Sequence, residues 1–187
     1  QRNLVLSAKK MQSSLVAIHE IRKLKFEEIA EIWARELWPR RQSMIEKNSA
    51  MEPDLTVNIE NMSQPAWHIG WMERQKLVAV LSGHPVSKGF FRTRGLWVHQ
   101  NFRRQGIASQ LYRQMEKTAK DINCHTVWTM PRISSWVFYE KIGFEKYNCT
   151  DQFEFGPHYL AKKSIDATTF DVSECRGAVQ TCGIFDR

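Results

Sequence analysis

The stretch from Leu96 to Ser109 constrains the fold of this chain more than any other part of the sequence. An apolar, β-prone run ends at Val98, a basic turn follows, and a helical pattern begins beside Gly106. The first N–H groups of a helix have no partner within the helix, and together they carry about half a positive charge. A glycine in the turn lets the backbone approach a ligand closely. The stretch therefore predicts a phosphate-binding cradle between a strand and a helix.

Two arginines in the turn strengthen this prediction. Arg103 and Arg104 can add charge-assisted hydrogen bonds to a phosphate, although a solvated basic turn is the competing interpretation. The pattern is neither the G-x-x-x-x-G-K-[ST] of P-loop proteins nor the G-x-G-x-x-G of dinucleotide-binding folds. The glycine beside a helix start favours phosphate binding over a merely solvated turn.

The distribution of charge points to the same place. The chain of 187 residues carries 27 Lys and Arg against 20 Asp and Glu, a net charge of +7. Residues 88–120 contain eight of the basic residues and one acid, Glu116, so this stretch alone has a net charge of +7. Such a charge predicts an anionic partner: nucleic acid, a membrane surface or a phosphorylated small molecule. Because the charge surrounds the predicted cradle, we expect the small molecule.

The rest of the chain alternates between strand and helix patterns. Strands are predicted over 15–21, 66–72, 77–82, 90–98, 126–130, 144–149 and 155–162, and helices over 26–38, 42–49, 105–122 and 133–142. A tight turn at 73–76 should join two of the strands as an antiparallel hairpin. The helix over 105–122 should connect two parallel strands, so the expected sheet is mixed.

Two blocks of the sequence resemble the GNAT superfamily of N-acetyltransferases. The turn Arg103-x-x-Gly106-x-Ala108 is similar to the family's R/Q-x-x-G-x-G/A, and SWVFYEKIGF at 135–144 is similar to its later A-x-x-F-Y-x-x-x-G-F. The resemblance covers roughly residues 13–163. It implies an α/β (α+β) GNAT acyl-CoA N-acyltransferase fold, with a mixed, mostly antiparallel sheet of six to seven strands flanked by about four helices.

The resemblance also implies a set of residues that bind acetyl-coenzyme A (acetyl-CoA), the cosubstrate of this family. The backbone of Trp97 and Val98 would pair with the pantetheine arm. Further contacts to the coenzyme are expected from Arg103, Arg104, Gln105, Gly106, Ile107, Ala108, Ser109 and Ser135. Tyr139 would be the general acid that protonates the leaving sulfur, and a core tyrosine on an amphipathic helix is the alternative.

The general base and the acceptor pocket are less defined by the sequence. His99 lies nearest to the predicted pantetheine site, and the other candidates for the base are His84, His68 and Glu73. A histidine at the end of a strand can equally be structural. For the acceptor, Trp38 with Arg40 and Arg41 could recognise an acidic or aromatic molecule. Asp151 and Glu154 could instead attract an amine.

These residues predict an acetyl-CoA-dependent N-acetyltransferase in which a primary amine attacks the thioester directly. The alternative is a non-catalytic, acyl-CoA-binding domain of the same fold, and a nucleic-acid-binding protein is a third possibility that lacks a motif. The expected partners are acetyl-CoA and an amine acceptor, with a possible homodimer and with neither nucleic acid nor a membrane.

The remaining expectations concern organisation and compartment. We expect the transferase domain at 13–163, an N-terminal extension at 1–12 and a C-terminal tail at 164–187 that is disordered, covers a sheet edge or joins a dimer interface. The four cysteines form no C-x-x-C pair and match no zinc spacing, so no metal site is expected. Because the start of the sequence has no apolar signal segment, we expect the cysteines to be reduced thiols in a cytoplasmic protein.

Overall fold

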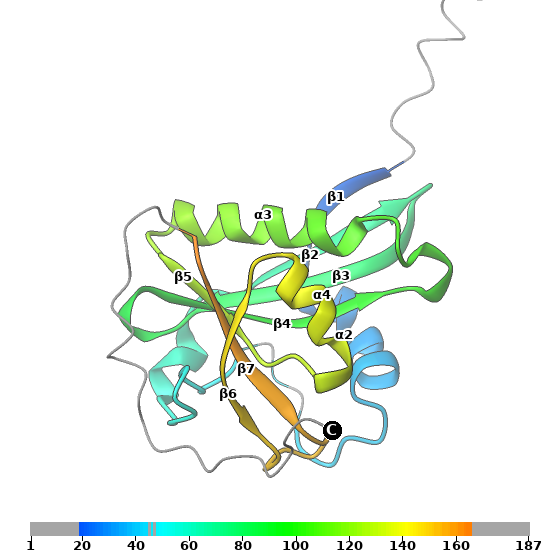
Figure 1. Cartoon of the computed structure of the whole chain (residues 1–187). Coiled ribbons are helices and arrows are strands. Elements are labelled where there is room, and N and C mark those ends of the chain that lie inside the picture. Colours follow the sequence, from blue (N-terminus) through cyan, green and yellow to red (C-terminus); the bar gives the residue numbers. More distant parts are fainter. Residues whose placement is uncertain (1–18, 45, 47, 166–187) are drawn as a thin grey trace, which may run out of the picture.

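A seven-stranded sheet forms the centre of the computed structural model, which describes residues 19–44, 46 and 48–165 (Figure 1). In sheet order the strands run β1-β2-β3-β4-β5-β7-β6. Their bounds are β1 His19–Leu24, β2 Trp67–Glu73, β3 Lys76–Pro85, β4 Phe90–Val98, β5 Thr126–Thr129, β6 Glu145–Thr150 and β7 His158–Ser164. All neighbouring strands are antiparallel except β4 and β5, which are parallel. The mixed, mostly antiparallel sheet predicted from the sequence is therefore confirmed.

Three α-helices pack on the two faces of this sheet. Helix α2 spans Phe26–Ile32 and continues as a π-helical turn over Trp33–Leu37, α3 spans Ile107–Asp121, and α4 spans Trp136–Lys141. Helix α3 is the crossover between β4 and β5, as the sequence predicts. It lies with α4 against one face, whereas α2 and its π-helical turn pack against the other. None of the helices in the described part of the chain is long and apolar enough to cross a membrane.

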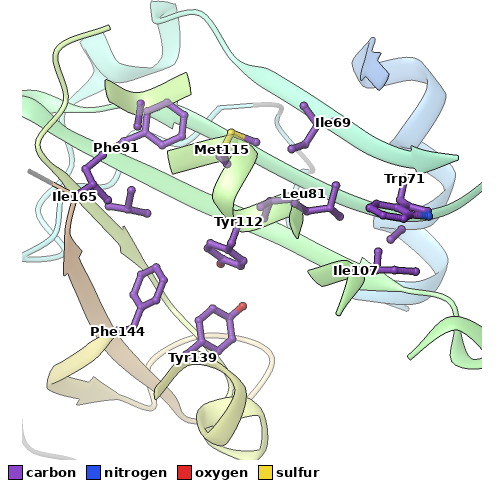
Figure 2. Packing of buried hydrophobic residues seen from close by; sticks show 14 of the residues in the cluster. Ile69, Trp71, Leu81, Phe91, Ile107, Tyr112, Met115, Tyr139, Phe144 and Ile165 are labelled. Carbon is purple, nitrogen blue, oxygen red and sulfur yellow. The ribbon is translucent and has the colours of Figure 1, made fainter. Parts of the chain in front are cut away.

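The main core lies between α3, α4 and the sheet (Figure 2). Leu111 and Met115 on the inner stripe of α3 are fully buried, and Leu81 and Phe91 meet them from β3 and β4. Fully burying a side chain of this size stabilises the fold by about 1.5–3 kcal/mol. This apolar stripe fixes the rotation of α3 on the sheet and hence the direction in which its N-terminus points.

Strand β4 is distorted where it approaches the end of α3. Gly95 has φ +66° in the middle of the strand, and a Cβ atom there would come within 2.9 Å of three atoms of the Trp33 indole. The pairing of β4 with β5 covers only Phe90–Arg92, although β4 continues to Val98. The ladder between the two parallel strands thus ends at Arg92, and beyond it the Thr129 hydroxyl of β5 donates to the Thr93 carbonyl at 3.0 Å.

Several predicted boundaries need correction. No helix forms in the described part of 42–49, because the backbone carbonyls of Glu46 and Asn48 accept hydrogen bonds from Arg94 at 3.3 and 3.2 Å. Tertiary contacts thus replace helical ones, and three α-helices are described where about four were expected. Strand β1 ends at Leu24 rather than at 21, and residues 15–18 of its prediction lie outside the described residues. Strand β3 extends beyond the predicted 82 to Pro85.

Candidate active site

A cavity of about 1050 Å³ opens between the start of α3, the second half of β4 and the N-terminus of α4. One half of its wall comes from the predicted cradle and from α4. The other half comes from the π-helical turn after α2, the segment 41–51 and the loop between β6 and β7. The predicted coenzyme and acid residues on this wall are Trp97, Val98, Arg103, Arg104, Gly106, Ile107, Ala108, Ser109, Ser135 and Tyr139.

The predicted cradle has the geometry that a pyrophosphate requires. Gly106 is the N-cap of α3 with φ +79°, and no side chain caps the helix, so its first N–H groups remain available. A Cβ atom at Gly106 would meet nothing within 4 Å. The space in front of the backbone is therefore open, and the residues present fit the phosphates of a coenzyme.

The arginines of the turn lie beside this opening. The Arg103 Nε–H donates to the Val98 carbonyl at 2.9 Å, which ties the turn back to the end of β4. Arg104 has φ +62°, a left-handed conformation that non-glycine residues adopt at a cost of about 1–3 kcal/mol. Both side chains are exposed and line the cavity. The turn thus holds two positive charges close to the uncapped start of α3.

Tyr139 reaches the cavity from α4 although it is only 7% exposed. Its ring packs edge-on against Tyr112 and Phe144, each with centroids 5.7 Å apart (Figure 2). Its hydroxyl hydrogen-bonds with that of Tyr112, which lies 3.2 Å from the Thr93 hydroxyl. Burial, more than the neighbouring phenol, raises the pKa of Tyr139 well above its usual value of 10.0. The phenol therefore keeps its proton throughout the neutral range.

Two residues predicted for the site are not on the cavity wall. His99 caps the short turn after β4: its Nδ1 accepts from the Asn101 backbone N–H at 3.3 Å, and its ring packs against Trp97 and Phe102. The Gln105 side-chain amide donates to the Asn101 carbonyl at 3.2 Å. In this conformation both side chains support the turn rather than face the cavity.

The other candidates for the base also lie away from the cavity. His68 is buried and hydrogen-bonded to the Ser82 hydroxyl at 2.8 Å, and Glu73 lies at the far end of β2. His84 is 1% exposed, and burial, helped by the charge of Arg92, lowers its pKa to about 3. His84 is thus a neutral core residue across the physiological pH range.

Because His84 is buried in its neutral form, we expect the free energy of unfolding to fall in acid. Its pKa is about 3 in the folded state and 6.5 in the unfolded state, so its contribution is complete above pH 6.5 and declines as pH falls toward 3. One such group can remove about 1.4 kcal/mol per pH unit from the free energy of unfolding. The free energy of unfolding, measured with urea, should therefore fall less between pH 7.0 and pH 4.5 in His84→Gln than in the wild type. The expected difference is about 2 kcal/mol. An equal loss in both proteins would contradict this assignment.

The acceptor half of the cavity contains residues that the sequence singled out and residues that it did not. Of the predicted group, Trp38, Arg41 and Glu154 line the cavity, whereas Arg40 and Asp151 do not. The residues missed are Glu36, Glu46, Arg92, Arg94 and His158. The two arginines could have been found, because charged residues at alternate positions of an otherwise apolar strand share one face.

The carboxylates and the histidine in this half have defined surroundings. Glu154 accepts from the Gln42 backbone N–H at 2.7 Å and from the Ser43 hydroxyl at 3.4 Å. Burial lowers the pKa of His158, and a hydrogen bond to the Gly156 backbone partly offsets this effect. Neither of the two described cysteines, Cys124 and Cys149, lines the cavity, and burial raises the pKa of the Cys124 thiol to about 11. Cys175 and Cys182 lie outside the described residues.

Comparisons with solved structures show the same fold. An aminoglycoside 6'-N-acetyltransferase complexed with coenzyme A is 16% identical, with a TM-score of 0.62 over 81% of this chain and 99% of that one. The ribosomal-protein-S18-alanine N-acetyltransferase of Escherichia coli is 14% identical, with a TM-score of 0.58 over 81% and 96%. Ard1 of Thermoplasma volcanium is 16% identical, with a TM-score of 0.60 over 79% and 98%.

Sequence comparison adds the family. No curated protein sequence matches the chain. The sequence model of the acetyltransferase (GNAT) family matches residues 18–144, which include both the turn before α3 and helix α4. This match covers more than half of the chain, and the fold is the one shared with the acetyltransferase structures above. The chain therefore belongs to the GNAT family of acetyltransferases.

Proposed function

We propose that this protein transfers an acetyl group from acetyl-CoA to a primary amine. The observation that carries the proposal is the left-handed Gly106 at an uncapped helix start, with open space in front of it and Tyr139 on the wall of the same cavity. Acetyl-CoA, when bound, supplies the activated acetyl group as a thioester. The residues of this chain would bind the coenzyme and move the protons.

The first role is to hold the coenzyme. The N–H groups at the start of α3, with Arg103 and Arg104, would bind the pyrophosphate. The backbone of β4 at Trp97 and Val98 would pair with the pantetheine arm, because β4 has no ladder with β5 beyond Arg92 in the described structure. These contacts would place the thioester at the point where the two strands separate.

The second role is to move protons. When the amine attacks the thioester carbonyl, the C–S bond breaks and the sulfur needs a proton, which the Tyr139 hydroxyl would donate. The amine loses its own proton to a base. His99 was expected in that role but does not line the cavity, whereas Glu36, Glu46 and Glu154 do. We therefore propose that the base is one of these three carboxylates. Neither cysteine in the described part of the chain lines the cavity, which is consistent with direct attack by the amine.

A thiol-release assay tests the proposal. Acetyl-CoA is mixed with the protein and a panel of primary amines, released thiol is measured, and mass spectrometry identifies the acetylated product. Acetyl-CoA without an amine is the control for hydrolysis. Calorimetry with coenzyme A is run in parallel. Binding with no turnover on any amine would indicate the non-catalytic acyl-CoA-binding alternative, and no binding would reject both.

Binding of nucleic acid is less well supported by the structure. Of the basic residues at 88–120, Arg92 is buried in the cavity wall, while Arg103 and Arg104 belong to the cradle. Arg113, Lys117 and Lys120 are exposed on α3. The charge that forms one block in the sequence is thus divided among separate places, which does not favour one continuous basic surface.

A further inference from the structure

Two arginines of β4 enter the acceptor half of the cavity without a described ion-pair partner. Arg92 and Arg94 alternate along the strand, so both face the side of the sheet that carries α2, opposite α3. Arg92 is only 8% exposed. The ion pairs found among the described residues join other side chains, and none includes either arginine.

The described side-chain contacts of the Arg92 guanidinium are all with neutral groups. One Nη donates to the Ser49 hydroxyl, the other lies 3.5 Å from the Met130 sulfur, and the group lies 4.7 Å from the centroid of Trp128. Its Nε–H is buried with no hydrogen-bond partner. Burial, followed by the charge of Arg94, lowers the pKa of Arg92. A buried positive charge without a counter-charge and a buried N–H without an acceptor each cost free energy. A bound anion would supply both the counter-charge and the acceptor.

Arg94 extends the same positive region toward the π-helical turn. Its guanidinium lies 4.9 Å from the ring of Trp33 and 5.4 Å from that of Trp38. It donates to backbone carbonyls of the segment 46–48. Burial, helped by the charge of Arg41, lowers the pKa of Arg94 to about 10, and Glu46 acts in the opposite direction.

The cavity as a whole is cationic. Seven Lys and Arg side chains line it, against the carboxylates of Glu36, Glu46 and Glu154. Three of the cations, Arg103, Arg104 and Lys141, lie on the cradle side, where the phosphates of the coenzyme would need them. Of the carboxylates, Glu154 already accepts two hydrogen bonds from 42–43. The acceptor half thus has four lining arginines (Arg41, Arg92, Arg94 and Arg132) against three carboxylates among the described residues, which leaves it with an excess of positive charge.

We propose that the acceptor is an amine that also carries a carboxylate, and that Arg92 and Arg94 bind this carboxylate. This inference rests on the proposed acetyltransferase function and specifies its substrate class. Guanidinium groups match the planar geometry of a carboxylate. The acceptor would thus be oriented with its carboxylate toward Arg92 and its amine toward the separation of β4 and β5. A free amino acid and a short peptide both offer this chemistry.

Matched acceptors test the proposal. Free amino acids and short peptides are each assayed with a free carboxylate and as the carboxamide, which distinguishes the two sources. We expect kcat/KM to be at least about 10-fold higher for each carboxylate than for its carboxamide, because the carboxamide loses one charge-assisted contact. Arg92→Gln and Arg94→Gln should each remove this preference, mainly through KM. Arg35→Gln, whose side chain is 76% exposed on the surface, is the matched control.

A binding measurement makes the outcome independent of turnover. N-acetyl amino acids and their amides are titrated into the protein with coenzyme A, and tryptophan fluorescence reports binding because Trp128 and Trp33 stack on the two arginines. Tighter binding of the carboxylates, lost in Arg94→Gln, supports the proposal. Equal binding of both members, or binding of neither, overturns it. If an arginine variant does not fold, the wild-type preference decides alone.

The two proposals fail in different ways. If coenzyme A binds and carboxamides are acetylated as well as carboxylates, the acceptor class is wrong and the transferase stands. If coenzyme A does not bind, the proposed function itself is wrong. A purely structural role, in which Arg92 and Arg94 only hold the segment 46–49, would lower stability in both variants and leave the ratio between paired acceptors unchanged.

Discussion

A Gly106→Glu variant should fold and should bind coenzyme A at least about 100-fold more weakly, a loss of about 2.7 kcal/mol. Apart from the adjacent residues, no described atom lies within 4 Å of a Cβ at this position, so this first side-chain atom meets no steric conflict. The φ of +79° costs about 1–3 kcal/mol for a non-glycine residue, which a typical domain tolerates. The carboxylate would occupy the space of the pyrophosphate and repel it. Calorimetry with coenzyme A measures the effect.

Gly156→Glu is a matched control for the backbone strain. Gly156 has φ +82°, and a Cβ there also meets nothing within 4 Å, but the residue does not line the cavity. The two variants should lose similar free energy of unfolding, and only Gly106→Glu should lose coenzyme binding. Normal binding by a folded Gly106→Glu protein would reject the cradle and, with it, the proposed position of the coenzyme.

Removal of the Tyr139 hydroxyl should lower turnover by about 10²- to 10⁴-fold with little change in the KM for acetyl-CoA. The phenol lies at the cavity wall, and its hydroxyl hydrogen-bonds with Tyr112. Because burial raises its pKa above 10.0, the acid form persists, and the rate should not decline through Tyr139 as pH rises from 7 to 10. Steady-state kinetics of the wild type and of Tyr139→Phe over this range measure both effects.

Tyr159→Phe removes the same atom from a tyrosine that does not line the cavity, and its turnover should equal that of the wild type. A Tyr139→Phe enzyme with full turnover would leave Tyr139 as a core residue, the alternative that its packing against Tyr112 and Phe144 also fits. A raised KM with unchanged turnover would indicate a contact to the coenzyme instead of proton transfer.

Local patterns explain why so much of the coenzyme half could be predicted. The turn from Arg103 to Ala108 needs only neighbouring residues: a strand end, a glycine with positive φ and a helix start. The hairpin of β2 and β3, the crossover helix α3 and the parallel pair β4–β5 follow from periodicity in the same way. Local sequence patterns are therefore sufficient to predict this part of the candidate site.

The acceptor half depends on contacts that are distant in sequence. Arg92 meets Ser49 and Met130, and Arg94 meets the carbonyls of the segment 46–48 and the rings of Trp33 and Trp38. The same contacts explain why no helix forms in the described part of 42–49. His99 shows the opposite case: closeness in sequence to the cradle suggested a base, whereas its Nδ1 accepts a hydrogen bond within its own turn.

The sequence by itself predicted the family, the order of strands and helices along the chain and a candidate place for a phosphate, because each depends on short patterns that act through backbone geometry. Only the tertiary structure decided how the positive charge at 88–120 is divided. Alternation along β4 sends Thr93 to Tyr112 on the α3 face and Arg92 to the other face, beside Trp128. The charge that forms one block in the sequence is thus divided between two regions of the cavity and the exposed face of α3, since neighbouring residues of a strand point to opposite sides of the sheet.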